Sequence, residues 1–184
     1  MSAVRPAPSI DKGRAFTQVL VNTFIANLTT NFLWFALTFW IYLETRNVLA
    51  TAFLGGSYML LLAVLGVPFG GLVDRWRKKR VMVAAQLITA VAFALALALF
   101  LVLPGDAFTS LGSPALWALG ALVLAGAVVE SARGIALSTT VTLLVDADAR
   151  DRANGQVGIV NGLTFAVTSV FSGLAVGRLG MSWT

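Results

Sequence analysis

Cysteine and histidine are both absent from the 184 residues. Their absence excludes disulfide frameworks, thiol chemistry, imidazole metal sites and His-based catalytic triads. Charged residues are also scarce, at 11% of the chain against roughly 25% in an ordinary soluble domain. A soluble domain needs a polar shell around its core, and this sequence holds too little polar material to build one. We therefore exclude an ordinary soluble fold.

The few charges are mostly basic, with 13 Lys and Arg against 8 Asp and Glu. In a soluble protein this excess would point to nucleic acid, but here the cations lie in short gaps between apolar runs. The sequence also has no Gly-x-x-x-x-Gly-Lys phosphate loop and no pair of facing carboxylates. We expect no nucleic-acid partner, no enzyme activity and no cofactor or metal.

Long uncharged runs are what the sequence has instead. Four runs contain no Asp, Glu, Lys or Arg, and a fifth is interrupted only by Glu130 and Arg133. Each run reaches the length of about 20 residues that a helix needs to cross a hydrocarbon core about 30 Å thick. The sequence therefore predicts an all-α membrane protein with five transmembrane helices, near residues 18–43, 49–73, 81–103, 115–145 and 153–178.

Lysine and arginine are distributed unevenly between the two sides of these predicted spans. One side would hold Arg46 and Arg178, while Arg133 lies within a span. The other side would hold ten cations: Arg5, Lys12, Arg14, Arg75, Arg77, Lys78, Lys79, Arg80, Arg150 and Arg152. Because cytoplasmic loops collect Lys and Arg, we expect a multi-pass protein in a lipid bilayer with residues 1–14 as a cytoplasmic N-terminal tail.

The densest charge lies in FGGLVDRWRKKRVMV, residues 69–83, between the second and third predicted spans. The positive-inside rule alone would produce a basic loop here. The stretch also fits the pattern Gly-x-Leu-x-Asp-Arg followed by paired Lys or Arg, and so resembles the signature loop of the major facilitator superfamily. Arg77 stands where that family usually has glycine. The matching residues are Gly70, Leu72, Asp74, Arg75, Lys78 and Lys79.

Two further stretches support the resemblance. VDADARDRANGQVGIVNGL, residues 145–163, resembles the family's connection between helices four and five. NFLWFALTFWIYLETRNVLAT, residues 31–51, is similar to the first helix and following turn of the bacterial drug-efflux branch, which includes macrolide and siderophore exporters. The resemblance implies a location in a bacterial-type plasma (inner) membrane.

The family fold has twelve helices in two halves, with substrate bound near the midplane between them. Five spans would supply most of one half, so we expect residues 15–184 to be a partial N-terminal half, without the sixth helix and the C-terminal half that would pack against it. The resemblance implies a small-molecule substrate and protons as partners of the full-length parent. A complete five-span protein is the alternative.

Polar residues recur along one face of the first predicted span. Asn27, Asn31, Trp34, Thr38 and Tyr42 are spaced by three or four residues. Buried polar groups are costly in hydrocarbon, so such a face normally lines the bundle interior or a water-filled cavity. We take the first four as candidate substrate-cavity residues. The alternative is that Asn27 and Asn31 hold neighbouring helices together.

The last predicted span carries a similar stripe of Asn161, Thr164, Thr168 and Ser172. Asn161 is a further candidate for the cavity. Close helix packing is the favoured alternative for this stripe, because a face of small residues lies beside it. The small residues are Gly158, Gly162, Ala166, Gly173 and Gly177.

Glu130 and Arg133 stand out because they lie deep within a span and three residues apart, where they can pair on one helix face. An unpaired charge at that depth costs roughly 2.5–3.5 kcal/mol on insertion scales. A carboxylate that is paired in one state and protonated in another could couple transport to protons. A permanent ion pair that joins helices is the alternative.

The resemblance also implies a role for the loop charges. In the family, the signature aspartate caps a helix of the opposite half within a charge cluster that stabilises the outward-facing state, and this role would fall on Asp74. Arg75 and Lys78 would then pair with acids of the connection near residue 150. The candidate residues of that connection are Asp146, Asp148, Arg150 and Arg152.

Two functions of different class remain from the sequence. The first is the N-terminal part of a proton-coupled antiporter that exports drug-like or other small molecules by alternating access. The second is a non-transporting membrane module, either a truncated remnant or an accessory helical subunit.

Overall fold

The computed structural model describes residues 9–183, which form five long α-helices and three short 3-10 turns. The described part of the chain does not include residues 1–8 of the expected N-terminal tail, among them Arg5. It also does not include the side chain of Lys12. The long helices are α1 (Ser9–Thr45), α2 (Val48–Arg75), α3 (Lys78–Val102), α4 (Pro114–Leu144) and α5 (Arg150–Leu179). The short turns are η1 (Gly105–Phe108), η2 (Ala147–Ala149) and η3 (Met181–Trp183).

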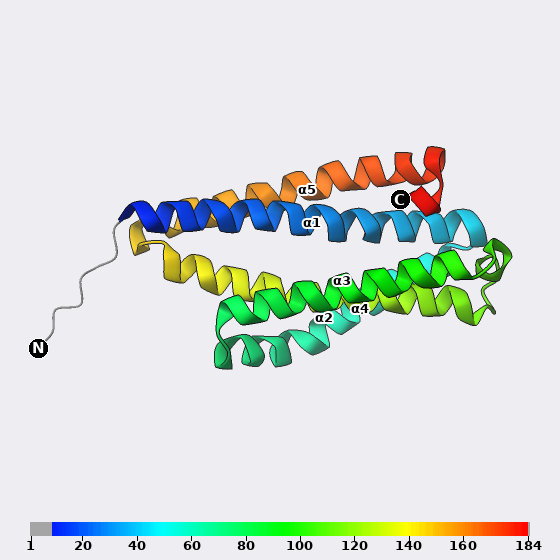
Figure 1. Ribbon diagram of the computed structural model, residues 1–184, viewed down its shortest axis with the longest axis horizontal. Helices are drawn as coiled ribbons and strands as arrows, with labels where there is room; N and C mark the ends of the chain where they lie inside the picture. Colours follow the sequence, from blue (N-terminus) through cyan, green and yellow to red (C-terminus); the bar gives the residue numbers. More distant parts are fainter. Residues whose placement is uncertain (1–8, 184) are drawn as a thin grey trace, which may run out of the picture.

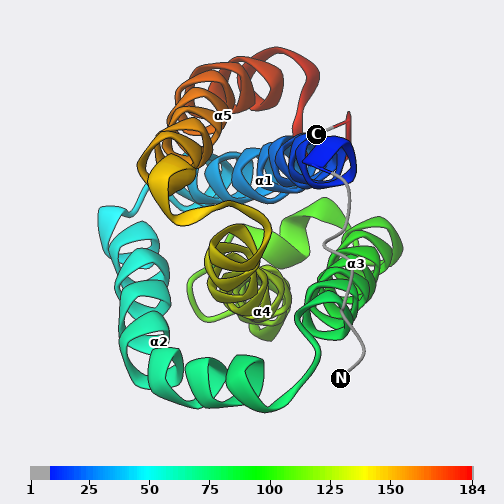
Figure 2. The ribbon, with the colours of Figure 1, turned by 90° about the vertical axis from the view of Figure 1, so that its left-hand side faces the viewer.

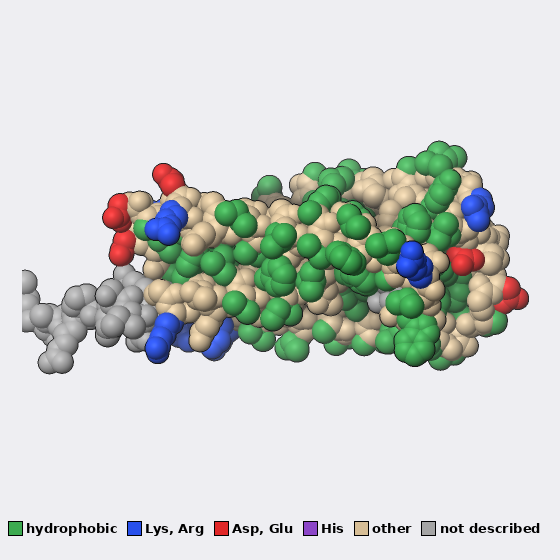
Figure 3. All heavy atoms as spheres, turned by 90° about the horizontal axis from the view of Figure 1, so that it is seen from above, with side chains coloured by type: hydrophobic (Ala, Val, Ile, Leu, Met, Phe, Trp, Pro, Cys, Tyr) green, Lys and Arg blue, Asp and Glu red, His purple; other side chains and the backbone are tan. Residues whose placement is uncertain are grey.

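All five long helices are long and apolar enough to cross a membrane. Figure 3 shows the charged side chains gathered toward the two ends of the molecule, with an uncharged band between them. The prediction of an all-α protein with five transmembrane helices is confirmed. α1 begins nine residues before the predicted start of its span at 18, and α5 begins three residues before the predicted 153.

Local sequence fixes where several helices begin. Asn47 precedes α2, and its side-chain oxygen accepts a hydrogen bond from the Leu49 amide at 2.8 Å. Ser113 precedes α4 and accepts from the Ala115 amide at 3.2 Å, with Pro114 at the first helical position. These residue types satisfy amide groups that have no partner inside the helix.

The connections between helices differ in length. Arg46 and Asn47 alone join α1 to α2, with Arg46 in the left-handed backbone region at φ 50°. Trp76 and Arg77 alone join α2 to α3. In Figure 1 the helices end at a similar level near the α1–α2 turn, whereas at the other end α1, α4 and α5 extend past the α2–α3 connection.

Helix α4 lies in the centre of the bundle and packs against the other four long helices (Figure 2). Its contact with α3 is close, because a Cβ atom built on Gly126 would lie 2.5 Å from Cε1 of Phe93. Thr89 of α3 donates a hydrogen bond from its hydroxyl to the Gly126 carbonyl at 3.0 Å. Small residues therefore allow these two helices to approach, as is usual in membrane interfaces.

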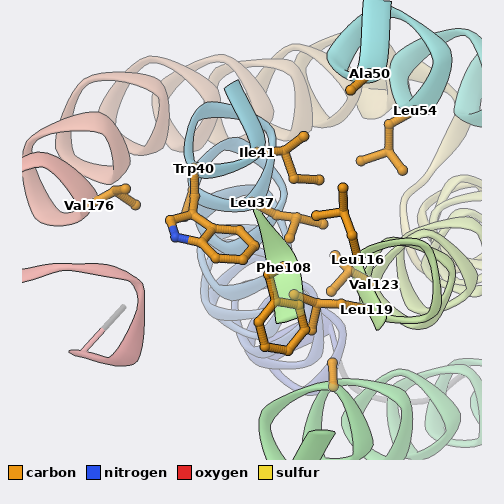
Figure 4. Close-up of a cluster of buried hydrophobic side chains, with 12 residues drawn as sticks. Leu37, Trp40, Ile41, Ala50, Leu54, Phe108, Leu116, Leu119, Val123 and Val176 are labelled. Atoms are coloured by element: carbon orange, nitrogen blue, oxygen red, sulfur yellow. The ribbon is translucent and has the colours of Figure 1, made fainter. Parts of the chain in front are cut away.

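An apolar core lies at the end of the bundle that holds the α1–α2 turn. It gathers side chains from all five long helices and the turn η1 (Figure 4). The rings of Trp40 and Phe100 meet edge to face at 5.5 Å, and Phe100 stacks on Phe108 at 5.5 Å. These geometries are favourable for aromatic pairs and fix η1 against the helices.

Candidate functional site

A buried ion pair lies on α4. Glu130 and Arg133 are 8% and 2% exposed, and the Arg133 Nε donates a hydrogen bond to Glu130 Oε1. The three-residue spacing places both side chains on one helix face. The structure therefore brings together the two charged residues that the sequence predicts as a pair.

Arg133 also joins α4 to α1. Its Nη2 donates to Oδ1 of Asn27 at 2.6 Å, and its Nη1 lies 3.5 Å from the hydroxyl oxygen of Thr23. That hydroxyl donates its own proton to the Val19 carbonyl at 2.8 Å, so its oxygen is free to accept from the guanidinium. The guanidinium thus has partners on α1 as well as the carboxylate on its own helix.

Asn27 extends the contact to α5. Its Nδ2 donates to Oδ1 of Asn161 at 2.7 Å. Because Arg133 can only donate hydrogen bonds, it fixes the Asn27 amide with the oxygen toward α4 and the nitrogen toward α5. Glu130, Arg133, Asn27 and Asn161 form a chain of polar contacts across three helices, which we call the polar relay.

The polar relay borders a cavity of about 410 Å³ between α1, α2, α4 and α5. Glu130 is one of the residues that line the cavity, and its Oε2 is buried without a hydrogen-bond partner among residues 9–183. A buried oxygen in that state is a ready acceptor for a proton or a donor group. The wall also includes Thr30, Asn31, Tyr58, Ser131, Asn154, Asn161 and Phe165.

The predicted stripe on α1 divides between two places. Asn27 and Asn31 line the cavity, and Trp34 packs on the cavity residue Tyr58 with ring centroids 4.8 Å apart. Thr38 lies instead in a separate groove with Tyr42. The structure therefore brings four of the five candidate cavity residues, Asn27, Asn31, Trp34 and Asn161, to or beside the polar relay and leaves Thr38 apart.

On α5 the polar stripe itself packs into the bundle. Thr164, Thr168 and Ser172 are buried toward the bundle. A Cβ atom built on Gly158, Gly162, Gly173 or Gly177 would meet no described atom within 4 Å. The small-residue face therefore makes no close helix contact within residues 9–183, whereas the hydroxyl residues of the stripe are buried, and Thr164 and Thr168 donate to carbonyls of their own helix.

The signature loop is compact and exposed. The Lys78 ammonium donates to the carbonyls of Val73 at 2.8 Å and Asp74 at 3.4 Å, where it satisfies the last turn of α2. The carboxylate of Asp74 forms no hydrogen bond or ion pair with residues 9–183. Gly70, Leu72, Arg75 and Lys79 lie at the same end of α2 and the start of α3.

The connection between α4 and α5 carries the other predicted loop charges. Arg150 donates from Nη2 to the Thr142 carbonyl at 3.2 Å, which ties the start of α5 to the end of α4. Asp146, Asp148 and Arg152 are exposed. The Lys78 ammonium donates to backbone carbonyls at the end of α2 instead of to an acid of this connection. Asp148 forms no ion pair with a described residue, so its expected pairing with the signature loop is not found among residues 9–183.

Sequence reasoning missed Tyr58 and Thr23. Tyr58 lies in the long apolar run of α2, where Thr51 and Ser57 are the other uncharged polar side chains, too few to form a polar stripe. Thr23 lies four residues before Asn27, and extension of the α1 stripe by one helical turn would have included it. No group of His, Cys, Asp or Glu residues that could hold a metal occurs within residues 9–183.

The family model described as Major Facilitator Superfamily matches residues 19–184. No curated protein and no solved structure matches the chain. The family match includes all five helices, the signature loop and the polar relay, so the chain belongs to the major facilitator superfamily and contributes five membrane-spanning helices to a transporter.

Proposed function

We propose that this chain is the N-terminal part of a proton-coupled exporter of drug-like or siderophore-like small molecules, in which Glu130 carries the proton. The exporter would work by alternating access in a bacterial-type inner membrane, with the N-terminus cytoplasmic. The observation that carries the proposal is the buried Glu130–Arg133 pair beside the cavity, in which one carboxylate oxygen has no hydrogen-bond partner among residues 9–183.

The contacts of Arg133 support a carboxylate that changes its protonation state. Protonation of Glu130 would remove the charge that pairs with the guanidinium. Asn27 and Thr23 would still accept hydrogen bonds from Arg133, so the cation would keep partners on α1. A buried charge that loses its only partner is strongly destabilising, and these contacts reduce that cost.

The cavity supports a substrate that is both polar and aromatic. Tyr58 and Phe165 supply aromatic surface, and the Trp34 ring packs on the Tyr58 ring. Asn31 and Asn161 supply amide groups that can donate and accept hydrogen bonds. Most of the residues that line the cavity are polar, so it suits a substrate with several hydrogen-bonding groups, and the second half of the transporter would complete the site.

The signature loop supports the assignment of the chain to the N-terminal part of the transporter. It also supports the role of Asp74 as a cap on a helix of the second half. The loop joins α2 to α3, which is where the family pattern occurs. Asp74 is exposed and has no ion pair with a described residue, so its carboxylate is accessible to a helix end of the second half.

The test is Glu130→Gln in the complete transporter, reconstituted in liposomes with an imposed pH gradient. The neutral amide keeps the shape but cannot release a proton, so we expect proton-driven efflux to fall at least a hundredfold. Substrate binding, measured in detergent, should change by less than about fivefold because the cavity wall remains.

Thr139→Val is the matched control, since Thr139 lies on α4 outside the set of residues that line the cavity and donates from its hydroxyl to the Ile135 carbonyl of its own helix. It should pump at close to the parental rate. Parental pumping by Glu130→Gln would show that the pair is structural. If the parent itself moves no substrate, the alternative of a non-transporting membrane module holds.

A further inference from the structure

A patch of exposed cations surrounds the α2–α3 connection. The side chains of Arg75, Arg77, Lys79 and Arg80, which we call the cationic patch, form no hydrogen bond or ion pair with residues 9–183. Lys78 already donates to carbonyls at the end of α2, and Asp74 is the only acid within residues 69–83. Four neighbouring positive charges therefore remain without a partner in the part of the chain that the structure describes.

Helix lengths place the cationic patch at the level of lipid headgroups. α3 has 25 residues and begins at Lys78, so it is about 37 Å long at 1.5 Å per residue. The hydrocarbon core is about 30 Å thick and the headgroups extend it to about 40–45 Å. The first turn of α3 therefore lies among phosphates when the apolar part of the helix spans the core.

The position of Trp76 also indicates that the α2–α3 connection lies at the level of the lipid headgroups. Trp76 and Arg77 together form the α2–α3 connection. Trp76 is 57% exposed, although it is one of the largest apolar side chains in the chain. Tryptophan is enriched at the boundary between hydrocarbon and headgroups, where its ring is apolar and its N–H can reach a polar partner. An exposed indole between four cations is suited to that boundary.

The α4–α5 connection shows that charge at this end of the molecule need not form such a patch. Its two cations, Arg150 and Arg152, alternate with the three acids Asp146, Asp148 and Asp151. In Figure 1 it also lies beyond the α2–α3 connection, at the extended ends of α1 and α5. The two connections therefore differ both in net charge and in depth.

We propose that the cationic patch binds the phosphates of anionic phospholipid headgroups in the adjacent leaflet. Each Lys or Arg near an anionic membrane surface strengthens binding by about 1 kcal/mol, roughly fivefold in affinity. The clustered guanidinium groups can each hold a phosphate through two hydrogen bonds, and Trp76 holds the connection at the right depth. This inference is independent of the transported substrate.

The experiment reconstitutes the complete chain in nanodiscs of phosphatidylcholine with about 30 mol% phosphatidylglycerol, then extracts it gently in detergent. Mass spectrometry of the co-purified lipids gives the enrichment of phosphatidylglycerol. We compare the parent with Arg77→Gln/Lys79→Gln and with the matched control Arg150→Gln/Arg152→Gln, which removes the same charge at the same end of the molecule.

We expect enrichment in the parent and in the control, and a loss of at least fivefold in the patch variant. Equal loss in both double variants would show a general charge effect and overturn the proposal. Displacement of phosphatidylglycerol from the parent by millimolar inorganic phosphate would indicate a free-anion site instead. Absence of enrichment in the parent would overturn the proposal even if the patch variant failed to fold.

Discussion

The two faces of α4 hold the bundle together by different physical means. Toward α3, Gly126 lets the helices approach until Phe93 and Thr89 touch the α4 backbone. Toward α1, the contact is made by the charged and amide groups of the polar relay. One face depends on shape and the other on a small number of directional contacts.

The difference suggests which contact can change during a transport cycle. Close packing of small residues distributes its energy over many atom pairs and has one good arrangement. A chain of hydrogen bonds can exchange partners when one member gains or loses a proton. α3 and α4 should therefore move together, and rearrangement should occur between α4 and α1.

The largest expected effect comes from Arg133→Gln. The substitution leaves Glu130 buried beside an amide, and breaking a buried pair in this way costs about 3–5 kcal/mol. Thermal unfolding of the purified chain in detergent measures this loss. If the melting temperature is unchanged, the polar face of α4 contributes nothing to stability and the comparison fails.

Glu130→Gln/Arg133→Gln sharpens this result. The double variant leaves no lone buried charge, so it should recover most of the stability that Arg133→Gln loses. Additive losses in the two single variants would mean that the side chains do not act as a pair.

A smaller effect is expected from Gly126→Ala on the other face of α4. The new methyl group would overlap the Phe93 ring, which costs about 1–3 kcal/mol for overpacking. Gly162→Ala on α5 is the control, because no described atom lies within 4 Å of the new group. That control should be neutral or stabilising by up to about 1 kcal/mol, since alanine favours helix.

The unfolding midpoints of these two variants and of Gly126→Ala/Phe93→Leu are measured together. They separate the effect of steric overlap with the Phe93 ring from the effect of helix propensity. The smaller side chain at 93 makes room for the methyl group and should recover part of the loss. A stable Gly126→Ala protein would show that the α3–α4 contact is looser than the structure indicates.

The smallest effect is expected from Thr89→Val, which removes one hydrogen bond between α3 and α4 while it keeps the side-chain volume. Such bonds between membrane helices average about 0.6 kcal/mol. Thr140→Val is the control, because its hydroxyl donates within α4 to the Ala136 carbonyl. A loss above about 2 kcal/mol for Thr89→Val would mean that the α3–α4 face also depends on directional contacts.

The fold was largely predictable because hydrocarbon excludes charge. Gaps between charged residues located all five helices, and the pattern around Asp74 indicated the family. Helix ends were less predictable: α1 continues back to Ser9, through Lys12 and Arg14, because charged residues are no obstacle to a helix once it leaves the hydrocarbon.

The candidate site was predictable only along single helices. The spacing of Glu130 and Arg133 predicts their pairing, and the stripe on α1 predicts that Asn27 faces inward. That Asn27 lies between Arg133 and Asn161 depends on how three helices are placed together, which no spacing within one helix encodes. The same holds for α5, since either of two adjacent faces could have met α1.

The two-residue turn between α1 and α2 has a mechanical consequence. Thr45 and Val48 can be at most about 11 Å apart, so this end of α1 acts as a fulcrum. With 37 residues, α1 is a lever about 55 Å long, and a rotation of about 10° would displace its far end by about 10 Å. Asn27 lies near the middle of the lever and would move by roughly 5 Å. A small tilt about this fulcrum is therefore enough to separate Asn27 from Arg133 while the aromatic core beside the turn stays closed.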